Sequence, residues 1–276
     1  MKNILLPTDF SENSKNAVVY AMELFKGHAC KFYFLNVQKT EEFVMDDVMS
    51  RSPGSSVFEV ILQDNKKRLK EFLVPLEEKY TKENFEFLPF VDYDSLTDSI
   101  KQLMASESID LIVMGTNGAT GAKEVLFGSN TLKVIRKVDC PVLAIPEHAS
   151  FEKLETILFT ASSCKDIKHE SARPLKEILD LFTPQLHLLK IKERKEESKH
   201  NCGSCLVDTL KRTQYKSYTL YGIPTPIAID AFVQLIPVDL HATFIERETF
   251  LERFLFGTNT AKISYGTRVP LLILHK

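Results

Sequence analysis

Glycines gather at two points in the first half of the chain, where they could do binding chemistry. Gly115-Thr116-Asn117-Gly118 follows the apolar run Leu111–Met114, and Gly128-Ser129-Asn130-Thr131 opens a helix-like stretch after nine intervening residues. Glycine lets backbone N–H groups approach a ligand closely, and the unpaired N–H groups that begin a helix attract anions. This spacing predicts a phosphate-binding site, although such glycines can also serve only to turn the chain.

Two other kinds of phosphate loop are excluded. A Walker loop ends in Gly-Lys-Ser/Thr, but here Lys123 follows Ala122 and precedes Glu124. A dinucleotide fingerprint places Gly-x-Gly-x-x-Gly after the first strand, whereas the first apolar run of this chain ends in Pro7-Thr8-Asp9-Phe10-Ser11, without glycine. The glycine pattern therefore belongs to a different class of phosphate site.

The sequence contains an internal repeat, which indicates a tandem duplication. Three pairs of segments match in the same order: Asn3–Leu6 with Thr156–Phe159, Phe127–Thr131 with Phe256–Thr260, and Cys140–Ile145 with Val269–Leu274. The first pair is 153 residues apart (157 − 4 = 153) and the other two are 129 apart (257 − 128 = 129), so the second copy is shorter by 24 residues (153 − 129 = 24). We therefore expect two domains, 1–148 and 153–276.

Both copies alternate apolar runs with amphipathic stretches. The strands expected in the first copy are residues 3–7, 32–37, 85–91, 111–114 and 142–145. Pro89 interrupts the third strand, and helices are expected after Ser11, after the capping-box residue Ser95, and over 129–137. Apolar strands separated by helices are typical of the α/β class, with a buried parallel sheet. The 24 residues missing from the second copy fall opposite the segment 38–83, which we expect to be a connecting helix or a lid.

Composition limits the class of protein. Of 276 residues, 44% are hydrophobic and 26% are charged, as in soluble globular proteins. The 35 Lys+Arg and 37 Asp+Glu give a formal charge of −2, which argues against nucleic acid as a partner. No apolar run approaches the roughly 18 residues of a membrane span, and five scattered cysteines suggest a reducing compartment. We expect a cytoplasmic protein without membrane association.

The residues of the predicted phosphate site resemble those of the universal stress protein family. The spacing Gly115-x2-Gly118-x9-Gly128-Ser129 is similar to that family's nucleotide loop, and Ile4–Asp9 is similar to its first strand. The resemblance implies two tandem Rossmann-like open parallel five-stranded sheets, each in the order 3-2-1-4-5. It also implies that the two fifth strands pair with each other in an intramolecular pseudo-dimer. A homodimer of the whole chain would be a further level of assembly.

The resemblance implies an adenine nucleotide as the ligand: ATP, or else AMP or ADP. Asp9 would lie near the adenosine, the backbone of Val37 would contact adenine, and the glycine loop would hold ribose and phosphates. The implied binding residues are Pro7, Thr8, Asp9, Val37, Met114, Gly115, Thr116, Gly118, Gly128, Ser129, Asn130 and Thr131. Asp9 is also the candidate ligand for a magnesium ion carried by the nucleotide.

The second copy has lost most of these residues. The replacements are Ser162 for Asp9, Phe244 for Gly115 and Arg247 for Gly118. Gly257-Thr258 is retained at the helix start. Bulky side chains should close a cavity where backbone must approach a ligand. We therefore expect one nucleotide per chain, bound by the first copy, and a degenerate second copy kept for packing or for protein partners.

No catalytic constellation accompanies the predicted site. The chain shows no Ser-His-Asp order and no paired catalytic carboxylates around these loops, and His148, His241 and His275 have no evident partner. ATP hydrolysis needs a positioned metal and a water-activating group, for which Asp9 is the sole acidic candidate. We expect a regulatory nucleotide-binding module of the stress response without catalytic residues. The alternatives are a slow ATPase and a protein-interaction scaffold that binds no nucleotide.

His200, Cys202 and Cys205 form a separate candidate site. Cys-x2-Cys with a nearby His offers three zinc ligands; a redox pair is a second interpretation, and exposed cysteines without a function are a third. The other cysteines are expected to be small core residues: Cys30, Cys140 and Cys164.

The zinc interpretation predicts that the purified protein contains zinc and that a Cys202→Ser, Cys205→Ser double variant contains less, because a hydroxyl does not replace a thiolate as a zinc ligand. Atomic emission spectroscopy of both proteins measures the metal content. Equal zinc contents would end the metal interpretation.

Overall fold

The computed structural model describes residues 2–38, 57–116, 127–161, 169–192, 214–245 and 269–275. The strands of the first half are β1 (Asn3–Pro7), β2 (Cys30–Val37), β3 (Phe85–Asp92), β4 (Leu111–Gly115) and β5 (Val142–Ile145). Those of the second half are β6 (Thr156–Ala161), β7 (Gln185–Lys192), β8 (Tyr215–Tyr221), β9 (Leu240–Ile245) and β10 (Leu271–His275). The helices are α1 (Glu12–Leu24), α3 (Val57–Lys79), α4 (Leu96–Ser106), α5 (Ser129–Lys137), α6 (His169–Phe182) and α8 (Thr225–Leu235).

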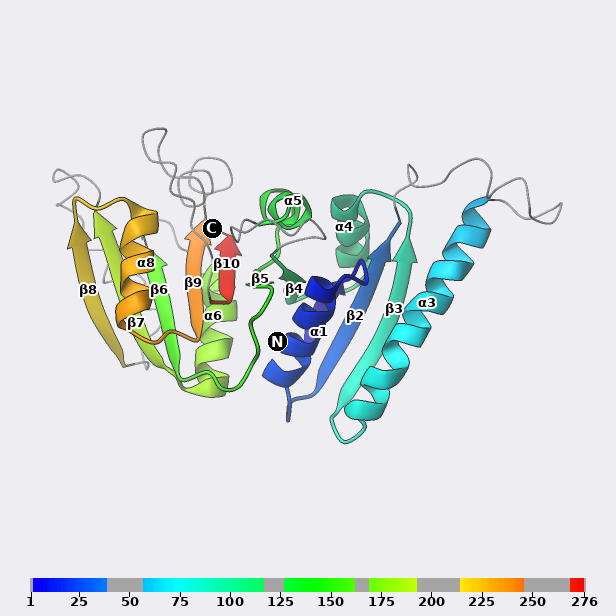
Figure 1. The fold of residues 1–276 in the computed structure, drawn as a ribbon, viewed down its shortest axis with the longest axis horizontal. Helices are drawn as coiled ribbons and strands as arrows, with labels where there is room; N and C mark the ends of the chain where they lie inside the picture. Colours follow the sequence, from blue (N-terminus) through cyan, green and yellow to red (C-terminus); the bar gives the residue numbers. More distant parts are fainter. Residues whose placement is uncertain are drawn as a thin grey trace.

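The ten strands of the described residues belong to one sheet (Figure 1), in the order β3-β2-β1-β4-β5-β10-β9-β6-β7-β8. The α/β class is as expected, and each half shows the strand order that the family resemblance implies. As the implied pairing of the two fifth strands leads one to expect, the two five-stranded halves join into a single continuous sheet. The reason is that β5 of the first half hydrogen-bonds to β10 of the second.

The pairing of β5 with β10 is antiparallel, while the other pairs of described strands are parallel. Ala144 lies opposite Leu271, and Leu143 lies opposite Leu272. Every residue of these two strands is buried. Because each strand covers the edge of the other, neither half exposes an apolar edge at this seam.

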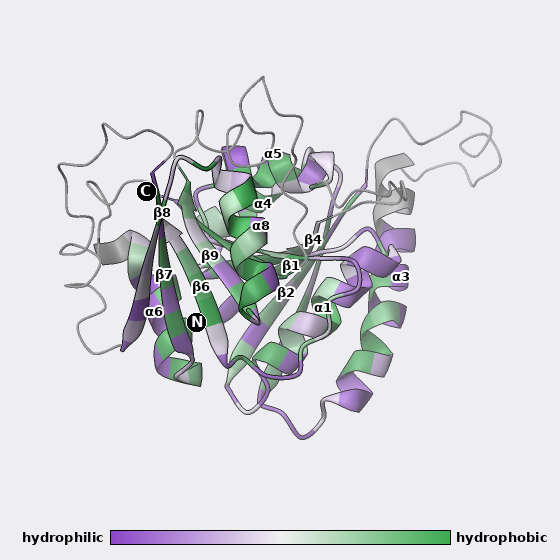
Figure 2. Ribbon diagram, turned by 60° about the vertical axis from the view of Figure 1, so that its left-hand side comes forward, coloured by the Kyte–Doolittle hydropathy of each residue, from purple (hydrophilic) through white to green (hydrophobic). Residues whose placement is uncertain are grey.

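Helices cover both faces of the sheet. The apolar residues of α1, α3 and α6 pack on one face, and those of α4, α5 and α8 pack on the other. Figure 2 shows hydrophobic colours in the middle of β6, while α3 alternates between hydrophobic and hydrophilic residues as expected for burial on one side. None of the described helices is long and apolar enough to cross a membrane.

The structure corrects one expectation about the third strand. β3 continues through Pro89, which lies opposite Phe34 of β2. In the described sheet β3 is an edge strand, so an N–H group that faces away from β2 is not needed for the ladder, and proline is tolerated there.

Other expectations fall partly on described residues. α3 occupies 57–79 of the segment after β2, as a connecting helix would, and residues 39–56 lie outside the described part of the chain. Cys30 and Cys140 are buried as expected, whereas Cys164 lies outside the described residues.

Two aspartates at matching positions of the repeat make the same hydrogen bonds in both halves. Asp110 Oδ2 accepts from the backbone N–H groups of Lys2 and Asn3 at 2.9 and 3.1 Å. Asp239 Oδ2 accepts from the two N–H groups at the entrance to β6, both at 2.8 Å. Each carboxylate therefore holds the first strand of its half beside the fourth.

Asp239→Ala should lower the free energy of unfolding by about 1–3 kcal/mol, because it leaves two N–H groups without their acceptor. Asp110→Ala should have a similar effect in the first half. Urea unfolding measures both. Asp180→Ala, at an exposed position of α6, is the control and should change stability by less than about 0.5 kcal/mol. Aspartate variants no less stable than this control would contradict the role assigned to the carboxylates.

Candidate functional site

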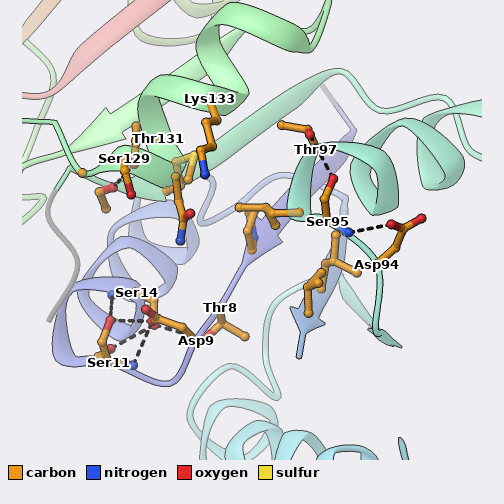
Figure 3. Close-up of a pocket in the computed structure, with 18 of the residues that line it drawn as sticks. Thr8, Asp9, Ser11, Ser14, Asp94, Ser95, Thr97, Ser129, Thr131 and Lys133 are labelled. Atoms are coloured by element: carbon orange, nitrogen blue, oxygen red, sulfur yellow. Dashed lines mark hydrogen bonds between the residues drawn. The ribbon is translucent and has the colours of Figure 1, made fainter. Parts of the chain in front are cut away.

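A cavity of about 630 Å³ lies at the carboxyl ends of the strands of the first half. β1 and β4 are neighbours there, with Ile4 opposite Leu111, and this switch in strand order is where open α/β sheets bind ligands. Figure 3 shows three groups of side chains around the cavity: Thr8 to Ser14 at the β1–α1 turn, Asp94 to Thr97 at the start of α4, and Ser129 to Lys133 at the start of α5.

The cavity brings together most of the expected binding residues. Those that line it are Pro7, Thr8, Asp9, Val37, Met114, Gly115, Gly128, Ser129, Asn130 and Thr131. Thr116 is not among the lining residues: it is fully buried, and its backbone N–H donates to the carbonyl of Ile145 at 2.9 Å. Gly118 lies outside the described residues.

Side-chain hydrogen bonds fix the turn between β1 and α1. Asp9 Oδ1 accepts from the backbone N–H and the hydroxyl of Ser11, at 3.0 and 2.5 Å. Ser11 is the N-cap of α1, and its Oγ accepts from the N–H of Ser14 at 3.3 Å. The Ser14 hydroxyl in turn lies 3.1 Å from Thr8 Oγ1. Asp9 therefore supports the cap of α1 while it also lines the cavity, so the two roles coexist.

The carboxyl group of Asp9 is ionised at neutral pH. Partial burial acts to raise its pKa, but hydrogen bonds from the side chain and backbone of Ser11 outweigh burial, so the pKa lies below its usual value of 3.8. An ionised carboxylate is an acceptor only, so Asp9 can receive hydrogen bonds from the hydroxyl groups of a ligand.

The backbone of Phe10, in the same turn, has an unusual conformation. Its φ is 62°, a region that bulky side chains rarely adopt. Its ring packs edge-on against Phe72 of α3, with ring centroids 5.9 Å apart, and the guanidinium of Arg68 lies 4.3 Å from the Phe10 centroid. The ring of Phe10 is thus held by α3 while its backbone, next to Asp9, is strained. Strained backbone of this kind is common at functional sites.

Gly115 must be glycine because of its neighbour α1. A Cβ atom at this position would lie 2.9 Å from the carbonyl oxygen of Asn13, which is closer than real contacts. The Gly115 carbonyl also accepts a hydrogen bond from the hydroxyl of Thr131 at 2.8 Å. Gly115 does line the cavity. The structure requires a glycine here for the close packing of β4 on α1, whereas the sequence analysis attributed the glycine to the close approach of a ligand.

Three helices begin at the cavity, and α5 differs from the other two. Their N-caps are Ser11, Ser95 and Gly128, and all three line the cavity. Ser11 and Ser95 accept a hydrogen bond from the first turn of their own helix, whereas Gly128 has no side chain that could do so. The first N–H groups of α5 therefore have no side-chain cap, and Lys133 adds a positive charge one turn later.

The connection between β3 and α4 forms a wall that the sequence did not predict. Its lining residues are Tyr93, Asp94, Ser95, Leu96 and Thr97. Asp94 accepts from the N–H of Ser95 at 2.7 Å and from the side chain of Gln102 at 3.1 Å. The capping-box signal at Ser95 could have identified this wall, because the carboxyl ends of parallel strands share one edge of a sheet.

Other lining residues were also missed, and they divide into two chemical kinds. Lys133 reaches from α5 toward the cavity (Figure 3), one helical turn after Ser129. Leu35 joins Val37, Leu96 and Met114 in an apolar part of the lining. The cavity therefore combines anion-binding groups at the start of α5 with apolar side chains that could contact a flat ring.

Within the described ranges, no three His, Cys, Asp or Glu side chains come close enough together to hold a metal ion. Asp9, the candidate magnesium ligand, directs Oδ1 to Ser11. His200, Cys202 and Cys205 lie outside the described residues, so zinc binding there stays a prediction.

The second half differs at the corresponding positions. Phe244, which replaces Gly115, is buried and packs edge-on against Phe159, with ring centroids 5.7 Å apart. His241, for which the sequence offered no partner, is fully buried with its Nε2 2.8 Å from the hydroxyl of Thr160. Burial lowers the pKa of His241 to about 3, so the ring is neutral at physiological pH. Ser162 and Arg247 lie outside the described residues.

A family model described as the universal stress protein family matches residues 1–146. The match covers more than half of the chain, which therefore belongs to the universal stress protein family. Universal stress proteins MJ0531 and MJ0577 of Methanocaldococcus jannaschii are 30% and 31% identical to it over 144 and 153 residues. These alignments cover 52% of this chain in both cases, and 81% and 94% of the relatives.

Solved structures share the fold along nearly the whole chain. A universal stress protein from Archaeoglobus fulgidus superposes with a TM-score of 0.67 at 16% identity, covering 99% of this chain and 96% of that one. A putative universal stress protein from Pseudomonas aeruginosa gives a TM-score of 0.61 at 14% identity, covering 100% and 93%. At these identities the likeness concerns the fold, and it includes the second half.

Asp9→Asn should destabilise the protein at neutral pH and progressively less in acid. Because the folded-state pKa of Asp9 is depressed, its carboxylate contributes stability above the usual value of 3.8 and loses that contribution as the pH falls through the folded-state value. Urea unfolding of both proteins between about pH 7 and about pH 2 measures the difference. Asp180→Asn is the control, and a gap that stays constant with pH would contradict the hydrogen-bonded state of Asp9.

Proposed function

We propose that the first half binds an adenine nucleotide, ATP or a related form, and that the bound nucleotide regulates a stress-response activity. The observation that carries this proposal is that three helices begin at one cavity and that α5 alone among them lacks a side-chain cap. An uncapped helix start offers N–H donors and a partial positive charge to an anion.

The start of α5 is the phosphate end of the proposed site. Ser129 and Asn130 are exposed there, and Lys133 is the cation among the described lining residues. The two carboxylates of the lining, Asp9 and Asp94, belong to the starts of the other two helices. This distribution of charge orients the ligand, because the phosphates avoid the carboxylates and meet the lysine.

The nucleoside end extends toward β1 and β2. The ionised Asp9 can accept hydrogen bonds from ribose hydroxyl groups, as an acidic residue does in other nucleotide-binding α/β folds. Leu35, Val37 and Leu96 offer apolar surface for the base. The cavity volume of about 630 Å³ falls in the range of small-molecule sites. The family resemblance supports the same orientation, with the backbone of Val37 next to adenine.

Regulation fits the lining better than rapid catalysis does. The described lining residues include neither His nor Cys, and Asp9 already accepts two hydrogen bonds from Ser11. A magnesium ion would arrive with the nucleotide and be held mainly by its phosphates. Binding can instead favour one arrangement of the β1–α1 turn and of α5, and a protein partner could then distinguish the bound from the free state.

We infer that the chain has two domains, 1–148 and 153–276, with different roles. The first carries the nucleotide site, and the second is a degenerate copy without one. Phe244 supports this inference, because a buried aromatic residue packed against Phe159 replaces Gly115, whose backbone lines the cavity of the first half. The second half would then serve packing and protein partners.

Ser129→Glu should weaken ATP binding at least about tenfold, because it places a carboxylate beside the phosphates. The same change should leave the free energy of unfolding unchanged or slightly higher, because a negative side chain stabilises a helix N-terminus. Calorimetric titration of ATP with magnesium measures the affinity, and urea unfolding measures the stability.

Ser129→Gln is the matched control, of nearly the same size without the charge, and should retain the affinity to within about threefold. Equal affinities of the Glu and Gln variants would contradict the placement of the phosphates. An absence of ATP binding in the wild type would favour the protein-interaction scaffold, and steady release of phosphate during the titration would favour a slow ATPase.

A further inference from the structure

We propose that the second half positions α5, and thereby tunes the affinity of the first half for phosphate groups, through a hydrogen bond from His275. The inference rests on the proposed function, because it concerns the phosphate end of the same cavity. It assigns a role in nucleotide binding to the second half, in which most of the residues equivalent to the proposed site are replaced.

His275 forms a bond that crosses from one half of the chain to the other. It is the last residue of β10 and is 8% exposed. Its Nε2 lies 2.8 Å from the carbonyl oxygen of Ile135 in α5. Because a carbonyl oxygen only accepts, Nε2 carries a proton and donates. This pair could not be predicted from local sequence signals, because 140 residues separate the two partners.

The Ile135 carbonyl belongs to the last turn of α5, which ends at Lys137. The last four carbonyl groups of a helix have no N–H partner within the helix. A histidine donor satisfies such a carbonyl and is favoured by the negative end of the helix dipole. His275 therefore acts as a cap for the C-terminal end of α5 that is supplied by the other half.

α5 connects this cap to the cavity. The helix has nine residues, so its ends are only about 13 Å apart, and its first turn lines the cavity. Val134 and Ile135 are fully buried in the same apolar cluster as Leu271 and Ile273 of β10, and α5 lies over the seam between the halves (Figure 1). A short helix held this way shifts as a unit, so a change at one end moves the groups at the other.

The position of the first half that is equivalent to His275 carries no hydrogen-bond donor. By the repeat offset, His275 corresponds to Pro146 (275 − 129 = 146). A proline side chain has no hydrogen-bond donor. Pro146 therefore cannot donate an equivalent bond, and this asymmetry matches the restriction of the proposed nucleotide site to the first half.

Titrations of ATP and of adenosine test the proposal on the full chain. His275→Leu should raise the Kd of ATP about fivefold, because α5 is then held less firmly and its first N–H groups are less well placed for the phosphates. The same variant should bind adenosine to within about twofold of wild type, because adenosine has no phosphates to meet α5. His275→Gln keeps an N–H donor near the position of Nε2 and should restore ATP affinity to within about twofold of wild type.

Thr160→Val is the matched control, because it removes the bond to His241 in the core of the second half without changing a residue that contacts the Ile135 carbonyl. It should leave both affinities unchanged. Equal losses for ATP and adenosine in His275→Leu, an unchanged ATP affinity, or a failure of Gln to rescue it would each overturn the proposal.

Amide hydrogen exchange of α5 is a second measurement, and it needs no nucleotide. Exchange over α5 should be faster in His275→Leu than in wild type and in His275→Gln, and unchanged exchange would overturn the proposal. An absence of ATP binding by the wild type would overturn the proposed function, and hydrogen exchange would then decide on its own whether His275 holds α5.

Discussion

The antiparallel pairing of β5 with β10 is the contact on which the rest of the structure depends. It converts two half-sheets into one ten-stranded sheet and covers an apolar edge strand of each. It also places β10 beside the first half, so that His275 reaches the C-terminal end of α5. Through this seam, the second half, which differs at the positions of the candidate site, remains in contact with the first half, which contains that site.

The candidate site follows from strand order together with helix capping. Because β1 and β4 are adjacent, α1, α4 and α5 all begin at the same edge of the sheet. Serine side chains satisfy the starts of α1 and α4, whereas Gly128 leaves α5 without a side-chain cap. Charge is divided in the same way, with Asp9 and Asp94 at the capped helices and Lys133 on α5. This asymmetry gives the cavity a cationic end at α5 and an anionic end at α1 and α4.

Features that depend on local sequence could be predicted, and those that depend on tertiary contacts could not. The helix after Ser11, the cap at Ser95 and the helix after Gly128 were predicted because cap residues and apolar spacing are local signals. The positive φ of Phe10 and the packing of Gly115 against α1 depend on residues that only the fold brings together. The resemblance implied that the two fifth strands pair, but their antiparallel register came only from the fold.

The central claim is that one chain offers one nucleotide site, in its first half. Equilibrium dialysis of radiolabelled ATP against the full chain at saturating concentrations counts such sites directly. The account predicts a stoichiometry close to one nucleotide per chain. Two equivalent sites would contradict it, because the second half would then bind nucleotide despite the buried ring of Phe244, and a stoichiometry near zero would contradict the assignment of the cavity itself.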